Sequence, residues 1–128
     1  MLDTNVVSDF LRDPRGAARS RMASLSDERP CLSAIVAAEL QFGILKKGSE
    51  RLSRQLHAVL SALDIVPWGP PADLEYAQIR LALETEGQPI GPNDMLIAAH
   101  ALALGAPLVT ANLEEFLRVP GLAVVPWR

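Results

Sequence analysis

One glutamate occupies a position where a helix would carry apolar side chains. Three and four positions away from Glu39, the sequence has only apolar residues or glycine, namely Ile35, Val36, Phe42 and Gly43. Buried glutamate is rare unless it is paired or bound to a metal, because an uncompensated charge inside a protein is costly or raises the pKa of the group. Two interpretations are open: Glu39 is a metal ligand, or it forms an ion pair with an arginine such as Arg12 or Arg80.

Two aspartates stand in constrained positions. Asp94 follows the run Ile90-Gly91-Pro92-Asn93 and opens the most apolar segment of the chain, where a negative charge also interacts well with a helix dipole. Asp3 can accept backbone hydrogen bonds in an Asx-type turn. Each aspartate alone therefore has a structural explanation. If both converge with Glu39, their hard oxygen atoms make a site suited to Mg²⁺ or Mn²⁺.

Short apolar strands alternate with helices along the chain. Strands are expected at residues 1–3, 31–32, 65–66, 107–110 and 123–125, and helices at 6–12, 16–25, 34–47, 52–63, 72–86 and 94–104. Ser33 and Asn93 are expected to cap helix starts, and Gly48 a helix end. Because the strands are apolar throughout rather than alternating, the pattern predicts an α/β fold with a small parallel sheet covered on both faces.

The expected sheet brings polar residues to one edge. In such sheets ligands bind outside the carboxyl ends of the strands. Those ends carry Asp3 and the segment Thr110-Ala111-Asn112.

On the helix at 72–86, the side chains expected to face inward are Leu74, Ala77 and Leu81.

Length and composition point to one compact domain. The chain has 128 residues, of which 49% are hydrophobic and 21% charged, so residues 1–128 are expected to form a single core. The longest apolar stretch, 95–104, is too short to cross a bilayer. One cysteine, Cys31, and the absence of a leader-like start favour a reducing cytoplasm. His57 and His100 lack ligand spacing and are expected to have surface or core roles.

Charge is distributed unevenly between the two halves of the chain. The net charge is -3, which argues against a protein that coats nucleic acid over its whole surface. Residues 1–54 carry nine basic and seven acidic side chains (+2), whereas 55–128 carry three and eight (-5). Contact with a polyanion is therefore expected in the first half.

Four landmarks in order resemble the PIN-domain ribonucleases, and most closely their VapC-type toxins. They are Leu2-Asp3-Thr4-Asn5-Val6-Val7, Ser33 to Glu39-Leu40 with Gly43, Ile90-Gly91-Pro92-Asn93-Asp94 with Ile97-Ala98-Ala99, and Thr110-Ala111-Asn112 before Phe116. The resemblance spans nearly the whole chain. It implies a three-layer α/β/α fold with a mostly parallel sheet of four to five strands flanked by helices.

The resemblance also implies a site and a reaction. The metal-binding acids fall on Asp3, Glu39 and Asp94, and the polar members of the catalytic set on Asn5, Thr110 and Asn112. Many relatives have an aspartate where this chain has Asn112, and Glu115 is the alternative fourth acid. The implied activity is a Mg²⁺- or Mn²⁺-dependent endoribonuclease, the toxin of a toxin-antitoxin pair, that uses metal-activated water and leaves 3′-hydroxyl and 5′-phosphate ends.

Such an enzyme needs a basic rim and partners. RNA approaching an acidic pocket requires cations nearby, and the first candidates are Arg12, Arg15, Lys46 and Lys47. Further candidates are Arg19, Arg21, Arg51 and Arg54. The resemblance implies an antitoxin that covers the groove and a homodimer, for which the leucine-rich segment 52–63 and Trp68 offer an apolar surface, although core packing explains the same spacing.

Two other functions stay open from the sequence. A catalytically weak PIN-like module that binds RNA or a partner without cutting is suggested by Asn112 and by the short first strand. A Mg²⁺-dependent phosphatase with Asp3 as the nucleophile is disfavoured, because such enzymes need a second aspartate where this chain has Asn5.

Overall fold

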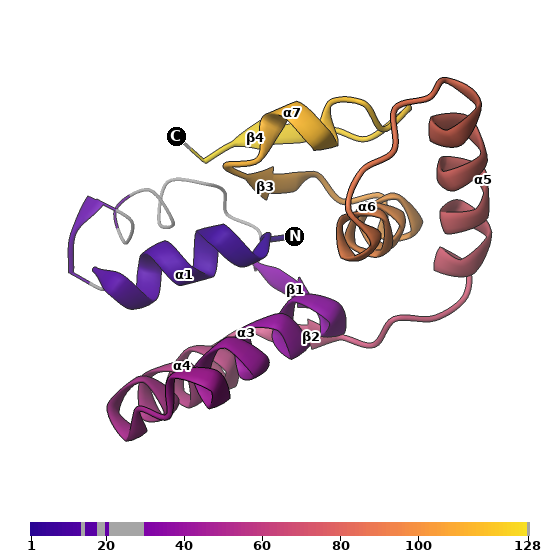
Figure 1. The fold of residues 1–128 in the computed structure, drawn as a ribbon. Coiled ribbons are helices and arrows are strands. Elements are labelled where there is room, and N and C mark those ends of the chain that lie inside the picture. Colours follow the sequence, from indigo (N-terminus) through magenta and orange to yellow (C-terminus); the bar gives the residue numbers. More distant parts are fainter. Residues whose placement is uncertain (14, 18–19, 21–29, 128) are drawn as a thin grey trace.

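Short parallel strands lie at the centre of the fold, with helices to both sides (Figure 1). The computed structural model describes residues 1–13, 15–17, 20 and 30–127, and the statements below refer to these. The expected helix at 16–25 lies largely outside them. In chain order the elements are α1 (Thr4–Arg12), β1 (Cys31–Ser33), α3 (Ala34–Lys47), α4 (Glu50–Ala62), β2 (Asp64–Val66), α5 (Ala72–Thr85), α6 (Pro92–Leu104), β3 (Leu108–Thr110), α7 (Leu113–Phe116) and β4 (Val124–Pro126).

The strands form two parallel pairs joined by the first residues of the chain. β1 pairs with β2, and β3 pairs with β4. Leu2 makes a single parallel bridge to Val109, and its amide also donates to the Cys31 carbonyl at 3.0 Å. The α/β class is confirmed, with residues 1–3 acting as a bridge rather than the expected strand. This arrangement places Asp3 beside Thr110 at the carboxyl ends of the strands.

The helix boundaries follow local capping chemistry. Ser33 accepts a hydrogen bond from the Ile35 amide and begins α3, and Gly48 ends that helix with a φ of 66°, a left-handed conformation that favours glycine. The expected cap at Asn93 is wrong. Pro92 occupies the first position of α6, so the helix begins before Asn93 and frees its side chain for another contact.

A buried polar pair crosses the core. The Nδ1 atom of His100 lies 2.8 Å from the Ser33 hydroxyl, and His100 is 2% exposed. Burial lowers the pKa of His100, so its ring is neutral in the core. The expected core role is therefore confirmed for His100, whereas His57 is exposed on α4 and Cys31 is half-buried against the core.

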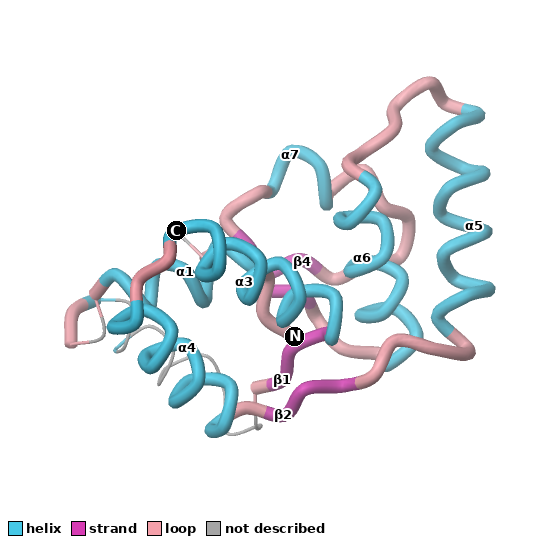
Figure 2. Tube along the Cα trace, turned by 60° about the horizontal axis from the view of Figure 1, so that its bottom comes forward, coloured by secondary structure: helices cyan, strands magenta, loops and turns pink. Residues whose placement is uncertain are grey.

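The prediction of which face of α5 is buried is wrong. Figures 1 and 2 show α5 beside α6, at the side of the molecule away from α4. The residues it buries are Ala72, Ile79 and Leu83, whereas the expected inward residues Leu74, Ala77 and Leu81 are exposed. The two sets lie on opposite faces of the helix at 100° per residue, and packing on α6 selects the first.

Leucines of α4 belong to the core. Leu56 and Leu60 are 1% and 8% exposed, so their spacing reflects packing within the chain rather than an open interface. Trp68 is half-buried, and its indole donates to the Leu96 carbonyl at 2.9 Å. Within the described residues, no helix is long and apolar enough to span a membrane.

The two leucine environments of α5 give a stability test. Leu83→Ala should lower the free energy of unfolding by about 3 kcal/mol, because it removes a side chain that is fully buried against α6. Leu81→Ala, on the same helix but 69% exposed, should change it by less than about 0.5 kcal/mol. Urea unfolding of both variants measures the difference. A larger effect of Leu81→Ala than of Leu83→Ala would show that α5 buries the other face.

Candidate active site

Asp3 is the most enclosed carboxylate of the candidate site. It is 4% exposed and caps α1, with Oδ1 accepting from the Thr4 amide at 2.8 Å. Its Oδ2 accepts from the Thr110 hydroxyl at 2.7 Å and from the Asn5 side-chain amide at 3.1 Å. Burial raises the pKa of Asp3, and the hydrogen bonds from Thr110 and Thr4 oppose that rise. The surrounding donors thus hold this carboxylate in one orientation.

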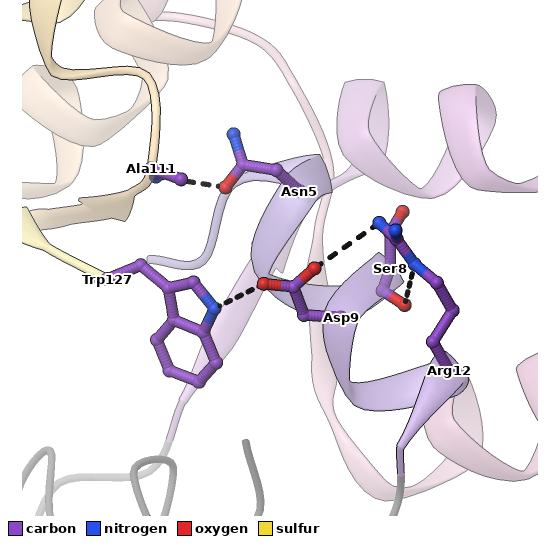
Figure 3. A network of polar contacts seen from close by, with 6 residues as sticks. All are labelled: Asn5, Ser8, Asp9, Arg12, Ala111 and Trp127. Carbon is purple, nitrogen blue, oxygen red and sulfur yellow. Dashed lines mark hydrogen bonds and ion pairs between the residues drawn. The ribbon is translucent and has the colours of Figure 1, made fainter. Parts of the chain in front are cut away.

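Asn5 and Thr110 tie α1 to the end of β3. The side-chain oxygen Oδ1 of Asn5 accepts a hydrogen bond from the Ala111 backbone amide at 3.0 Å, a contact visible in Figure 3. Thr110 is fully buried, and while its hydroxyl donates to Asp3 it accepts from the Asn112 amide at 2.9 Å. The polar residues predicted around Asp3 therefore form one hydrogen-bonded frame.

Glu39 joins this frame from α3. Its Oε1 accepts from the Thr4 hydroxyl at 2.7 Å and its Oε2 from the Asn93 side chain at 3.3 Å. The sequence reasoning missed Thr4 and Asn93, although Thr4 adjoins Asp3 and Asn93 adjoins Asp94. These contacts link α1, α3 and α6, which carry three of the four sequence segments that resemble the PIN-domain ribonucleases.

The environment expected for Glu39 is corrected in two respects. It is half-buried rather than enclosed by apolar groups, since its helix neighbour Phe42 is 67% exposed. The ion-pair alternative is wrong for the two named arginines, because Arg12 pairs with Asp9 and Arg80 with Glu84. The described residues offer Glu39 polar neutral partners and no arginine.

The side-chain amide of Asn112 lies between Asp94 and Glu115. The Asn112 side-chain nitrogen lies 3.4 Å from Asp94 Oδ2 and 3.1 Å from Glu115 Oε2. Burial, a hydrogen bond with Glu115 and the nearby charges of Asp3, Glu115 and Glu39 raise the pKa of Asp94 to about 8. The same hydrogen bond to Asp94 is the main cause that lowers the pKa of Glu115. Of the two acids, Asp94 is therefore the one whose neutral form is favoured.

The donor set suits a small, hard divalent cation. Asp3, Glu39 and Asp94 present carboxylate oxygens next to hydroxyl and amide groups, and their mutual repulsion is relieved by positive charge. Among the described residues, no three acidic, imidazole or thiol side chains are grouped closely enough to enclose one ion. The fit to a divalent cation therefore rests on the hard oxygen chemistry of the donors.

The candidate basic residues are exposed but separate in position. Arg12 ends α1 and Lys47 ends α3, and both line the same groove beside Glu39. Arg15 and Lys46 are also exposed but do not line it. Arg51 and Arg54 are exposed on α4, whereas Arg19 and Arg21 lie outside the described residues.

Known proteins with similar sequences and folds form a consistent group. Residues 1–122 match the model of a family described as PIN domain. The chain is 38% identical over 129 residues to Ribonuclease VapC2 of Rickettsia felis, and 35% identical over 128 residues to the tRNA(fMet)-specific endonuclease VapC of Salmonella typhimurium. Each alignment covers 99% of this chain and 96% of the relative.

A solved structure agrees with the sequence matches. The crystal structure of VapBC2 from Rickettsia felis bound to a DNA fragment from their promoter has a TM-score of 0.93 to this chain. The two share 36% sequence identity, and the match covers 100% of this chain and 98% of the other. The whole described fold, rather than one motif, is thus shared.

Repulsion among the carboxylates predicts a stability effect of Asp94→Asn. Because the pKa of Asp94 is raised in the folded state from 3.8 to about 8, the metal-free protein loses stability as pH rises across that range. The variant lacks this titration. Its melting temperature should match wild type near pH 4 and exceed it by several degrees at pH 8.

Thermal unfolding in EDTA measures this difference, with Asp73→Asn as the matched control because Asp73 also lies in the first turn of a helix but is exposed. Added Mg²⁺ should raise the melting temperature of wild type more than that of Asp94→Asn. A variant that is less stable than wild type at pH 8 would contradict the electrostatic account.

Proposed function

This chain belongs to the PIN-domain family, and on that premise we propose that it is a VapC-type endoribonuclease, the toxin of a toxin-antitoxin pair. Its substrate is RNA, whose phosphodiester bonds it hydrolyses. The observation that carries the proposal is the set of hydrogen bonds from neutral polar side chains to Asp3, Glu39 and Asp94, which come from the start of α1, from α3 and from α6. Their placement supports a hydrolytic site that uses a divalent cation.

Asp3, Glu39 and Asp94 would hold Mg²⁺ or Mn²⁺. A cation bound there supplies neutralisation of the phosphate charge and lowers the pKa of an attacking water. Mg²⁺ is the first candidate, because the three proposed ligands all offer hard carboxylate oxygens. A bound cation would favour the ionised form of Asp94, whose pKa is raised to about 8 without one.

The neutral polar residues orient the acids. Thr110 and Asn5 hold Asp3 through Oδ2, which leaves the carboxylate no freedom to rotate away from the site. Thr4 and Asn93 fix the two oxygens of Glu39 in the same way. The geometry of the acids is therefore set before RNA binds, and preorganised charge is the largest contribution that an enzyme site makes to rate.

Glu115 is proposed as the fourth acid. Asn112 stands where many relatives have aspartate, and its side chain bridges Asp94 and Glu115. An amide cannot supply the negative charge of an aspartate, but it places Glu115 next to Asp94. Glu115 thereby restores an acidic group at this corner of the site.

The proposed partners follow from the relatives. An antitoxin is the expected protein partner, since the related Rickettsia structure is a VapBC2 assembly. The chain is proposed to act on RNA in the cytoplasm and to form a homodimer. The curated Salmonella relative makes tRNA(fMet) the first defined substrate to test.

One observation favours a second candidate, a PIN-like module that binds RNA or a protein with little cleavage. Residue 112 is asparagine rather than an acid, so less negative charge is available to hold a second cation. This candidate predicts RNA affinity without divalent cations and no cleavage with them.

Cleavage of total cellular RNA tests the proposed activity. Wild-type protein should produce discrete fragments with Mg²⁺ or Mn²⁺ and none in EDTA. Asp94→Asn should lose at least about a hundredfold in rate, because it removes a charged oxygen from the site. Asp73→Asn should cleave like wild type. Cleavage by Asp94→Asn at the wild-type rate would refute the assigned site, and no cleavage by wild type under any condition would favour the binding module.

A matched pair on α7 tests the fourth acid. Glu115→Gln should reduce the cleavage rate roughly tenfold to a hundredfold and increase the Mg²⁺ concentration needed for half-maximal rate. Glu114→Gln should change neither, since Glu114 is 88% exposed and contacts Arg118 rather than Asp94. Rates measured over a Mg²⁺ titration separate the two, and equal behaviour of both variants would remove Glu115 from the site.

A further inference from the structure

A groove leads away from the acidic site between α1 and α3. It has a volume of about 360 Å³ and begins at Thr4 and Glu39, whose side chains are hydrogen-bonded at its inner end. Its far end carries Arg12 and Lys47. Apolar side chains form much of its wall, namely Leu11, Leu40, Ile44 and Leu52.

The groove has a regular construction because both helices expose every fourth residue along it. On α1 these residues are Thr4, Ser8 and Arg12, and on α3 they are Glu39, Gly43 and Lys47. Residues four apart lie on one helix face, so each helix presents three successive positions to the groove. Eight residues of helix span about 12 Å, which is the separation of the acidic and the basic ends along the axis.

Gly43 occupies the middle of the groove without a packing reason. A Cβ atom at this position would meet nothing within 4 Å, and the residue lies inside α3 with no left-handed backbone. Glycine inside a helix costs about 0.8 to 1 kcal/mol relative to alanine, so the sequence forgoes stability here. The absence of a side chain keeps the middle of the groove open, which is the condition for a chain to pass through it.

The basic end is held in place by the C-terminal part of the chain. Trp127 donates its indole N–H to Asp9 Oδ2 at 2.9 Å, and Asp9 Oδ1 lies 3.2 Å from an Arg12 guanidinium nitrogen (Figure 3). The Arg12 side chain is 73% exposed, so its ion pair with Asp9 is weak. The pair orients the guanidinium group and leaves it able to bind a phosphate.

We propose that this groove binds the RNA strand next to the cleavage site, with a phosphate of the strand held by Arg12 and Lys47 and the backbone passing over Gly43. The inference rests on the proposed ribonuclease function and assigns the polarity of the site: acids and cation at one end, a phosphate subsite at the other. RNA is the occupant argued for because its phosphates carry negative charge that complements the exposed cations Arg12 and Lys47 at the outer end of the groove.

Salt dependence of RNA binding tests the phosphate subsite directly. The probe is a short, labelled, single-stranded oligouridine, and binding is measured in EDTA, so that the outcome does not depend on cleavage. Arg12→Gln and Lys47→Gln should each weaken binding and reduce the slope of log affinity against log salt. Because both side chains hold one phosphate, the double variant should reduce that slope by about 0.7. The matched controls Arg15→Gln and Lys46→Gln, neighbours that do not line the groove, should keep the wild-type slope.

Gly43 variants test the path of the strand. Gly43→Leu should weaken oligouridine binding roughly tenfold by filling the groove, while its melting temperature equals or exceeds that of wild type because leucine favours the helix. Gly43→Ala adds one methyl group and should bind nearly as wild type does.

The outcomes separate this inference from the ribonuclease proposal. Unchanged slopes for Arg12→Gln and Lys47→Gln, with unchanged binding by Gly43→Leu, would overturn the groove assignment even if wild type cleaves RNA, and would make a polypeptide the occupant to test. Altered slopes without cleavage by wild type would support the groove and reject the nuclease.

Discussion

The burial of the Asp3 carboxylate is the constraint on which the site depends. A carboxylate that is 4% exposed is unfavourable unless donors surround it, and Thr4, Asn5 and Thr110 supply three hydrogen bonds. Those donors come from the start of α1 and the end of β3. Satisfying one side chain therefore also fixes how the first helix meets the sheet, because the Leu2 bridge to Val109 lies one residue away.

The remaining acids are arranged around this fixed point at an electrostatic cost. Glu39 and Asp94 arrive from α3 and α6. Burial, a hydrogen bond with Glu115 and the charges of Asp3, Glu115 and Glu39 raise the pKa of Asp94 to about 8. Neutral amides and hydroxyls bridge the acids, which orients them without cancelling their charge. A site of this kind is destabilised when empty and stabilised by a cation, so the same repulsion that lowers stability creates affinity for the metal. Function and marginal stability thus have one physical origin.

Local chemistry made some elements predictable from sequence and left others undetermined. The caps at Ser33 and Gly48 were predictable because side-chain and backbone requirements there are local. The buried face of α5 was not, because the helix has two apolar stripes on opposite sides and only packing on α6 selects between them. The expectation for Asn93 failed for a related reason: Pro92 starts the helix first, and the Asn93 side chain then reaches Glu39 on another helix.

The candidate acids could be chosen from the sequence, whereas the details of their surroundings could not. Asp3, Glu39 and Asp94 stood out through apolar or constrained neighbours, and the family resemblance placed them together. Thr4 and the Asn112 link to Glu115 became visible only in three dimensions, since they join residues on different elements or depend on side-chain direction. Which basic residues line the groove likewise depends on how α1 packs against α3, and this could not be read from the sequence.

The most direct test of the account is a binding isotherm for Mn²⁺, obtained by following the electron paramagnetic resonance signal of the free ion. The account predicts saturable binding by wild-type protein, competition by Mg²⁺, and loss of that binding in Asp3→Asn and Asp94→Asn, while the exposed control Asp73→Asn binds normally. Saturable binding that persists in both site variants, or is absent from wild type, would contradict the claim that these carboxylates form a divalent-cation site.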